Sequence, residues 1–297
     1  MKIGYFADGP WSHESIKLMV EDDSIEIAFI VPRFDTQDPV LKSWAEALNI
    51  PFLLYENVNS KEALAELKSF DCDLFVSMSF NQIIKRSLID VAPKGFINCH
   101  AGALPFYRGR NPLNWVLING EKEFGITVHY IDEGIDTGDV VEQELYPITD
   151  IDTYATLLSK AINKCGPILL KSIKSIQNGS ANRIPQSVIH PVGTYFCQRK
   201  VGDEFIDFNW TASRIFNFVR ALTTPGPLAR FRLSDRVVHV EEAFLIDRAP
   251  TYISKVGEIL EATDSIVRVK AADTVIDLKI LNNGNSLLGL KRGNVVC

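Results

Sequence analysis

Three side chains in the segment 96–140 have the types and spacing needed to move an acyl group from one nitrogen to another: Asn98, His100 and Asp136. In such a reaction an amine attacks a carbonyl, and negative charge develops on the oxygen. Asn98 can donate a hydrogen bond to that oxygen, and one such donor is worth roughly 3–4 kcal/mol of transition-state stabilisation. His100 can accept the amine proton, because imidazole is the side chain best suited to do so at neutral pH. Asp136 can orient or charge the imidazole, or relay a proton through water.

The spacing of this set indicates which side chains face one another. Asn98 and His100 are two residues apart, so in an extended strand they lie on one face, and Cys99 lies on the opposite face. We therefore do not expect Cys99 to act as a nucleophile. An Asn-x-His pair is short, and a lone histidine is more commonly structural, so the interpretation depends on the flanking residues.

The flanking sequence resembles the formyltransferases that use 10-formyltetrahydrofolate, a family that includes methionyl-tRNA, glycinamide ribonucleotide and sugar-nucleotide formyltransferases. The family's motifs fall on Asn98 and His100 (Asn-x-His), on residues 104–109 (Leu-Pro-x-x-Arg-Gly) and on residues 136–139 (Asp-x-Gly-Asp type). This resemblance implies that Asn98, His100 and Asp136 form the catalytic set. Many members have Ser-Leu-Leu-Pro where this chain has Gly-Ala-Leu-Pro at 102–105.

Composition predicts a soluble cytoplasmic protein with two cores. The chain has 297 residues, 46% of them hydrophobic, which is enough for one large core and one smaller one. Its start, MKIGYFADG, is typical of a strand rather than a signal peptide, and we expect no membrane span. Five dispersed cysteines without C-x-x-C spacing indicate free thiols in a reducing compartment. The five histidines are scattered, so we expect no metal site.

The order of apolar segments predicts an α/β fold with a doubly wound first domain, residues 1–184, and a smaller β-rich second domain, residues 185–297. The resemblance implies that the first is the Rossmann-like formyltransferase domain and that the second is OB-like. Strands are expected at 2–7, 25–31, 74–78 and 95–99, and helices at 11–20, 39–48, 60–70 and 112–118.

Further along the chain, residues 125–131 and 140–146 are expected to form a hairpin whose connection carries Asp136. Asp152 is expected to cap a helix that continues to about Ser175. Residues 185–193 are interpreted as a linker. In the second domain we expect a helix at 211–222 and strands at 237–244 and 265–269.

The cofactor expectation also depends on the resemblance. The first loop, residues 7–11, lacks G-x-G-x-x-G, so a dinucleotide is not expected. The resemblance instead places the pterin of 10-formyltetrahydrofolate against two loops. Their candidate contacts are Phe80, Gln82, Ile83, Ile84, Asp132 and Glu133. A flat heterocycle needs apolar walls, although isoleucines at such positions are as commonly core residues.

The acceptor of the formyl group is the more open question. A tRNA-binding protein should carry a basic surface, whereas this chain has a net charge of −6. The connection at residues 32–39 is also short, where the tRNA-modifying relatives carry a longer basic loop. Nucleic acid is therefore not the expected partner, although an acidic protein can still have a local basic patch.

Residues 8–11 and 108–115 look more like the sugar-nucleotide N-formyltransferases of surface-polysaccharide pathways, such as O-antigen and lipopolysaccharide synthesis. A dTDP-linked 4-amino-4,6-dideoxyhexose is the expected acceptor. An arginine can bind a diphosphate and an aromatic ring can stack on a sugar or base. The candidate substrate contacts are Asp8, Gly9, Trp11, Arg108, Arg110 and Trp115, and Tyr107 is a further stacking candidate.

Two alternatives remain open at this stage. The chain can be a methionyl-tRNA formyltransferase, or a folate-binding protein without catalysis, although the intact set Asn98, His100 and Asp136 argues against the latter. From the relatives we also expect a homodimer, in which strands of the second domain can cover their edges by pairing with a second chain.

Overall fold

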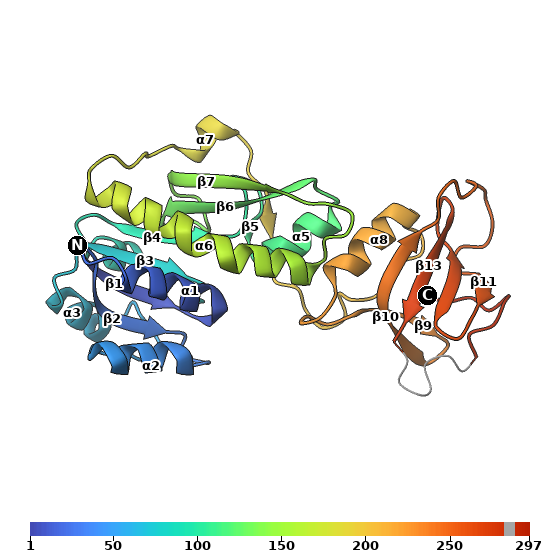
Figure 1. The fold of residues 1–297 in the computed structure, drawn as a ribbon, viewed down its shortest axis with the longest axis horizontal. Coiled ribbons are helices and arrows are strands. Elements are labelled where there is room, and N and C mark those ends of the chain that lie inside the picture. The colour runs from blue at the N-terminus through green and yellow to red at the C-terminus, as the bar shows by residue number, and fades with distance from the viewer. Residues whose placement is uncertain (282–288) are drawn as a thin grey trace. The chain divides into compact units, whose positions relative to one another are not determined.

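The computed structural model describes residues 1–281 and 289–297, which form two compact units (Figure 1). Unit 1 comprises Met1–Pro112, Phe124–Tyr146 and Ser159–Phe196. Unit 2 comprises Leu113–Glu123, Pro147–Leu158 and Cys197–Cys297. Each unit has its own main sheet, and both units are discontinuous in sequence.

The sheet of unit 1 is mixed and has the strand order β2-β1-β3-β4-β6-β7. Pairs β1–β2, β1–β3 and β3–β4 are parallel, and β6 runs antiparallel to β4. This arrangement confirms the predicted α/β class with a Rossmann-like first domain. The strands are β1 (Lys2–Ala7), β2 (Glu26–Pro32), β3 (Leu74–Met78), β4 (Phe96–His100), β6 (Glu123–Tyr130) and β7 (Val140–Pro147).

Helices pack on both faces of this sheet. On one face lie α1 (Gly9–Val20) and the part of α6 (Tyr154–Gln177) that belongs to unit 1, with Tyr5 of β1 donating a 3.1 Å hydrogen bond to the carbonyl of Ser12. Helix α6 approaches α1 closely at Gly166, where a Cβ would lie 2.9 Å from Leu18 Cδ1. The opposite face packs α3 (Lys61–Ser69) and α4 (Arg86–Ile89) onto a phenylalanine-rich core. That core includes Phe6, Phe29, Phe75 and Phe96 together with Leu67 and Leu88.

The helix starts follow from local side-chain chemistry. Helix α2 (Pro39–Leu48) begins after Asp38, whose carboxylate accepts hydrogen bonds from the backbone N–H groups of Val40 and Leu41. Ser60 caps α3 in the same way by accepting from Ala63 N–H. These short polar side chains satisfy N–H groups that have no partner inside the helix, so the helices begin close to the predicted positions.

Unit 2 is built around an antiparallel sheet with the order β11-β12-β13-β10-β9. Helix α8 (Ala212–Ala221) begins at the cap Thr211 and buries Ile215, Phe218 and Val219 in the core of the unit. This architecture confirms the predicted β-rich second domain. The strands are β9 (Ala229–Leu233), β10 (Arg236–Leu245), β11 (Ile259–Ala262), β12 (Ile266–Lys270) and β13 (Val275–Ile280), and the short helix α5 (Pro112–Ile118) lies almost wholly in this unit.

The main departure from the sequence expectation lies in the segment interpreted as a linker, residues 185–193. It contains the short helix α7 (Gln186–Ile189) and leads into β8 (Tyr195–Phe196), which pairs with β5 (Arg108–Gly109) in a parallel two-stranded sheet. The whole segment belongs to compact unit 1. The linker interpretation is therefore corrected, and the domain boundary at 184/185 stays a prediction. In the part of the chain that the structure describes, no helix is long and apolar enough to span a membrane.

Candidate active site

The structure brings Asn98, His100 and Asp136 together at one edge of the unit 1 sheet. His100 is the last residue of β4, and Asp136 lies in the connection between β6 and β7. His100 Nδ1 is 3.7 Å from Asp136 Oδ2. On the other face of β4, Cys99 Sγ lies 3.8 Å from the carbonyl oxygen of Cys165, which confirms that Cys99 points away from this group.

The orientation of the His100 ring is fixed by a backbone carbonyl. His100 Nε2 is 2.7 Å from Tyr107 O, and because a carbonyl oxygen can only accept, Nε2 must carry the hydrogen. The other nitrogen, Nδ1, therefore faces Asp136. Gly102 makes this possible, since a Cβ there would lie 2.7 Å from His100 Nε2 and 2.8 Å from Tyr107 O. The departure from the family's Ser-Leu-Leu-Pro pattern thus has a direct structural consequence.

Asp136 is held as a carboxylate by its surroundings. Burial alone would raise its pKa, but the electrostatic interactions with the imidazoles of His100 and His129 and the hydrogen bond from the backbone N–H of Gly109 together lower the pKa well below its usual range. The Gly109 N–H lies 2.8 Å from Asp136 Oδ2. At neutral pH the site therefore contains a fixed negative charge beside two imidazoles.

His129 is a site residue that the sequence interpretation missed. It lies in β6 directly opposite Asn98, with only 2% of its surface exposed. Its Nδ1 is bonded to Tyr130 O, so Nε2 faces the site, 3.3 Å from Asn98 Nδ2 and 3.5 Å from Asp136 Oδ1. The available signal was the alternation of the predicted strand 125–131, but the register with β4 was not derivable from it.

The six folate candidates divide into residues with exposed side chains and residues that stabilise the loops. Ile83 exposes 70% of its surface, whereas Ile84 is buried in the core. Gln82 bridges another loop, because it accepts from Val58 N–H and donates to Tyr55 O. Phe80 is half-buried against Phe6.

In the second folate loop, Asp132 accepts hydrogen bonds from Gly134 N–H and the Thr137 hydroxyl, so it shapes the loop. Glu133 is exposed. Ile135, which the sequence interpretation did not select, exposes 55% of its surface. Exposed isoleucines in both loops fit a ligand with an apolar face, because a flat heterocycle would cover them.

The substrate candidates of the first loop are already engaged. Asp8 accepts a hydrogen bond from the Thr36 hydroxyl, and its other oxygen lies 3.8 Å from Arg33. Gly9 N–H donates to Asp38, and Trp11 is half-buried at the start of α1. These contacts give the loop a defined conformation.

The remaining three candidates differ sharply. Arg108 donates to Gln186 Oε1 and to the Tyr195 hydroxyl. Arg110 is exposed, and among the described residues its guanidinium has no hydrogen-bond or ion-pair partner. Trp115 belongs to unit 2, where its indole N–H donates to Cys197 O. Of the three, Arg110 is the side chain available for a ligand.

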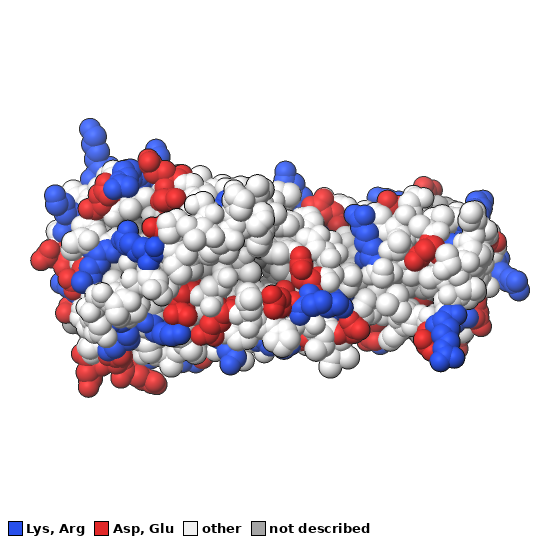
Figure 2. Space-filling view, turned by 90° about the horizontal axis from the view of Figure 1, so that it is seen from above, with Lys and Arg blue, Asp and Glu red and all other residues white. Residues whose placement is uncertain are grey.

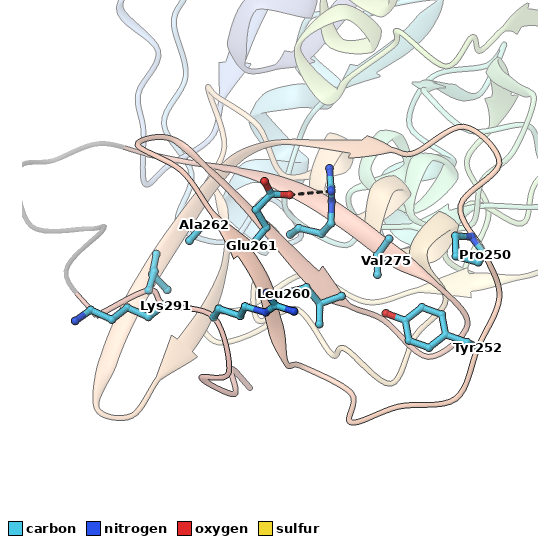
Figure 3. A pocket seen from close by; sticks show the side chains of 10 residues that line it. Pro250, Tyr252, Leu260, Glu261, Ala262, Val275 and Lys291 are labelled. Carbon is cyan, nitrogen blue, oxygen red and sulfur yellow. Dashed lines mark hydrogen bonds and ion pairs between the residues drawn. The ribbon is translucent and has the colours of Figure 1, made fainter.

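A concave region lies within unit 2 and contains none of the predicted site residues (Figure 3). It is an open hollow of about 750 Å³ whose lining includes Tyr252, Arg268 and Lys291. Arg268 is paired with Glu261 at 2.9 Å, as the dashed line in Figure 3 marks, and with Asp277 at 2.8 Å. Among residues 1–281 and 289–297, no cluster of three or more His, Cys, Asp or Glu side chains is arranged to hold a metal ion.

Comparison with known proteins identifies two family segments. Residues 20–173 match the family described as formyl transferase, and residues 199–288 match the formyl transferase C-terminal domain. Among curated proteins, the methionyl-tRNA formyltransferase of Pelotomaculum thermopropionicum is 32% identical over 270 residues, which cover 88% of this chain and 84% of the relative. That of Halalkalibacterium halodurans is 33% identical over 237 residues, covering 77% of this chain and 74% of the relative.

Two solved structures show the same fold at lower identity. WlaRD, a sugar 3N-formyltransferase crystallised in the presence of dTDP and 5-N-formyl-THF, has a TM-score of 0.70 and 23% identity over 95% of this chain and 98% of its own. The N-formyltransferase from Helicobacter canadensis, in complex with folinic acid and dTDP-3-aminofucose, has a TM-score of 0.71 and 20% identity over 95% of this chain and 100% of its own.

Proposed function

Because the chain belongs to the formyl transferase family, we propose that it moves a formyl group from 10-formyltetrahydrofolate to the amino group of a nucleotide-linked amino sugar. The bound folate supplies the formyl carbon. The amine nitrogen bonds to that carbon, the carbon–N10 bond breaks, the amine gives up one proton and N10 gains one, leaving a formamide and tetrahydrofolate.

Each residue of the set has a distinct role in this proposal. The Asn98 amide has two N–H groups, and only one is directed at His129, so the other can stabilise the oxyanion. His100 Nδ1 accepts the amine proton, and the Asp136 carboxylate stabilises the imidazolium that forms. The separation of 3.7 Å between His100 and Asp136 exceeds a direct hydrogen bond, so the carboxylate acts through its charge.

The guanidinium of Arg110, which is exposed and has no partner among the described residues, carries the proposal of a nucleotide-sugar acceptor. The Arg110 backbone N–H is held by Phe196 O at 2.9 Å, and its neighbour Gly109 is bonded to Asp136. An exposed arginine on a fixed backbone beside the proposed reacting groups is suited to bind a diphosphate.

The loop after β2 supports the same acceptor. Its Arg33 is paired with Asp35 at 2.7 Å and lies 3.8 Å from Asp8, so this cation is already neutralised. On the face drawn in Figure 2, Lys and Arg side chains are scattered among Asp and Glu rather than gathered into a basic area. A small anionic ligand fits this charge distribution better than an RNA duplex does.

Methionyl-tRNA is the second candidate acceptor, and the curated relatives favour it. Both relatives described above carry the name methionyl-tRNA formyltransferase, at 32% and 33% identity. The solved structures that contain dTDP or a dTDP-sugar share the fold, at 23% and 20% identity. The acceptor must therefore be tested directly.

The test is formyl transfer against a panel of dTDP-, UDP- and GDP-linked amino sugars, with methionyl-tRNA in parallel and tetrahydrofolate release as the readout. We expect turnover with one amino sugar, a dTDP-linked 4-amino-4,6-dideoxyhexose being our first choice. Turnover with methionyl-tRNA alone would establish the second candidate. Absence of turnover with every acceptor, matching His100→Ala, would favour a folate-binding protein without catalysis.

Arg110→Ala sharpens this test. If the guanidinium binds the diphosphate before and during the reaction alike, the KM for the nucleotide sugar should rise about tenfold or more with little change in kcat. Arg248→Ala is the matched control, because Arg248 is an exposed arginine of unit 2. Equal KM values in the two variants would exclude Arg110 from acceptor binding.

We further infer a cytoplasmic enzyme of surface-polysaccharide synthesis that forms a homodimer. The family and the proposed acceptor support the pathway. The edge strands of the unit 2 sheet are already bonded within the chain, β9 to residues 204–206 and Cys297 and β11 to residues 293–294, so the edge pairing expected from the sequence does not support the dimer. Sedimentation equilibrium tests the dimer, because a monomer at micromolar concentration would contradict it.

A further inference from the structure

Residues 184–196, which we call the strap, lie between the two segments that match the family, 20–173 and 199–288. The sequence interpretation treated most of this stretch as a linker. In the structure it bridges to β7 through Ile184 and Val140 and ends in β8, beside β5. We propose that the strap is part of the active site and that Gln186 is a positioning residue for Asp136 and His100. This inference rests on the proposed function.

Gln186 joins the two motif loops. Its side-chain nitrogen donates to the carbonyls of Asp136 and Gly138, each at 2.8 Å. Its side-chain oxygen accepts from Arg108 Nε at 3.0 Å and from Arg108 Nη2 at 2.6 Å. The residue is 3% exposed, and both N–H groups and both acceptor positions of its amide are used. Gln186 therefore fixes the Asp136 loop relative to the Leu-Pro-x-x-Arg-Gly turn.

The second half of the strap fixes the carbonyl that orients His100. The Thr194 hydroxyl accepts from Tyr107 N–H at 2.9 Å, and the Phe196 ring stacks on the Tyr107 ring with centroids 4.8 Å apart. Tyr107 O is the acceptor for His100 Nε2–H. The strap thus holds both members of the His100–Asp136 pair, Asp136 through Gln186 and His100 through Tyr107.

The close passage of the strap over the turn indicates that the two move as one body. A Cβ at Gly193 would lie 2.5 Å from Arg108 Nη1 and 2.7 Å from Pro105 O. Thr194 N–H donates to Pro105 O, and Thr194 O accepts from Arg108 N–H. Arg108 is half-buried, so loss of the Gln186 acceptor would leave two of its N–H groups without this partner and would destabilise the turn.

The experiment compares three variants with wild type, using the formyl acceptor that the panel identifies. Gln186→Leu removes all four hydrogen bonds, and Gln186→Glu keeps an acceptor for Arg108 but loses both donors to the Asp136 loop. Gln177→Leu is the matched control, because Gln177 is a half-buried amide of the same unit whose side chain, within the described part of the chain, bonds only to Ser24. Thermal unfolding of each variant reports how much stability the lost amide costs.

We expect both Gln186 variants to lower kcat by roughly 100-fold, the cost of a misplacement of about 1 Å, while KM for folate stays within about threefold. Gln177→Leu should keep wild-type kcat whatever its unfolding temperature. If Gln186→Glu keeps full activity, or if Gln186→Leu is as active as Gln177→Leu, the positioning role is overturned.

Hydrogen exchange of the Gly109 amide separates this inference from the proposed function, since it needs no turnover. The Gly109 N–H donates to Asp136, so Gln186→Leu should increase its exchange rate at least about tenfold relative to Gln177→Leu if the strap holds that loop. An unchanged exchange rate would overturn the positioning role of Gln186 even if the enzyme is active. Faster exchange in a protein that formylates no acceptor would support the positioning role of Gln186 and reject the proposed function.

Thr194→Val tests whether the strap also positions His100 through Tyr107. This variant removes the acceptor of the Tyr107 N–H, and a wild-type kcat would overturn that part of the inference.

Discussion

The two sheets of this protein use facing polar side chains in opposite ways. In unit 2, Arg268 lies opposite Asp277 and Lys279 lies opposite Glu242. Each pair forms an ion pair, with 2.8 Å between Arg268 Nε and Asp277 Oδ1 and 3.1 Å between Lys279 Nζ and Glu242 Oε1. In unit 1, Asn98 lies opposite His129, and this pair is completed only by Asp136 from a loop.

The difference follows from where each pair lies. The unit 2 pairs are partly exposed on an antiparallel sheet, where the opposite charge and solvent together satisfy the hydrogen-bonding groups of both side chains. The unit 1 group is largely buried at the edge where the parallel strands β1, β3 and β4 end, and loops from several strands converge there. Cross-strand register alone therefore does not identify a site. The distinguishing feature of the candidate site is a buried cross-strand pair, Asn98 and His129, that contacts a third polar group, Asp136, from a loop.

The largest effect that distinguishes the two regions should be on turnover. Asp136→Asn and His100→Ala should each lower kcat by roughly 10²–10⁴-fold with modest change in folate affinity, because the amine proton loses its acceptor or the imidazolium loses its counter-charge. Steady-state kinetics with the identified acceptor measures this. Asp277→Asn is the matched control and should be fully active. Near-normal turnover in either unit 1 variant would remove that residue from the chemistry.

A smaller loss is expected from Gly102→Ala. The added Cβ would enter the space between His100 Nε2 and Tyr107 O, so the ring must turn and kcat should fall by roughly 10- to 100-fold. Gly226→Ala in unit 2 is the control, because its Cβ would meet no atom closer than 3.3 Å. If the two variants have equal kcat values, the orientation of His100 does not depend on Gly102.

Part of this site could be predicted from the sequence alone. The alternation of Asn98, Cys99 and His100 fixed their faces, and the hairpin carrying Asp136 was expected within a few residues of its observed bounds. His129 was not predicted as a site residue. It lies 31 residues from Asn98 in the sequence, and the register between their two strands is set by tertiary packing. Gln186 was not found either, since a short helix in a Pro-containing segment has no periodicity to read. Ile83 and Ile84 are chemically identical, and only the fold separates the exposed one from the core one.

The next effect is on acid stability and belongs to Asp136. Its pKa is lowered in the folded state, despite burial, by His100, His129 and the Gly109 N–H. A lowered folded pKa means that the ionised group stabilises the fold above the unfolded value of about 3.8 and that this contribution is lost as pH falls through the folded pKa. The unfolding temperature of wild type should exceed that of Asp136→Asn at pH 7, and the gap should narrow between about pH 5 and pH 2. A gap that is constant over this range would contradict the charge interaction.

The smallest effect should come from the self-neutralised pair of unit 2. The guanidinium of Arg268 binds Asp277 through two hydrogen bonds of 2.8 and 2.9 Å, but its side chain is 37% exposed. Solvent screens such a pair, so a double-mutant cycle of Arg268→Ala and Asp277→Ala should give a coupling energy of about 1 kcal/mol or less, decreasing with added salt. Turnover should not change in any variant of the cycle. A coupling of several kcal/mol, or a loss of kcat, would mean that the unit 2 pair resembles the site of unit 1, and the contrast between the two sheets would no longer hold.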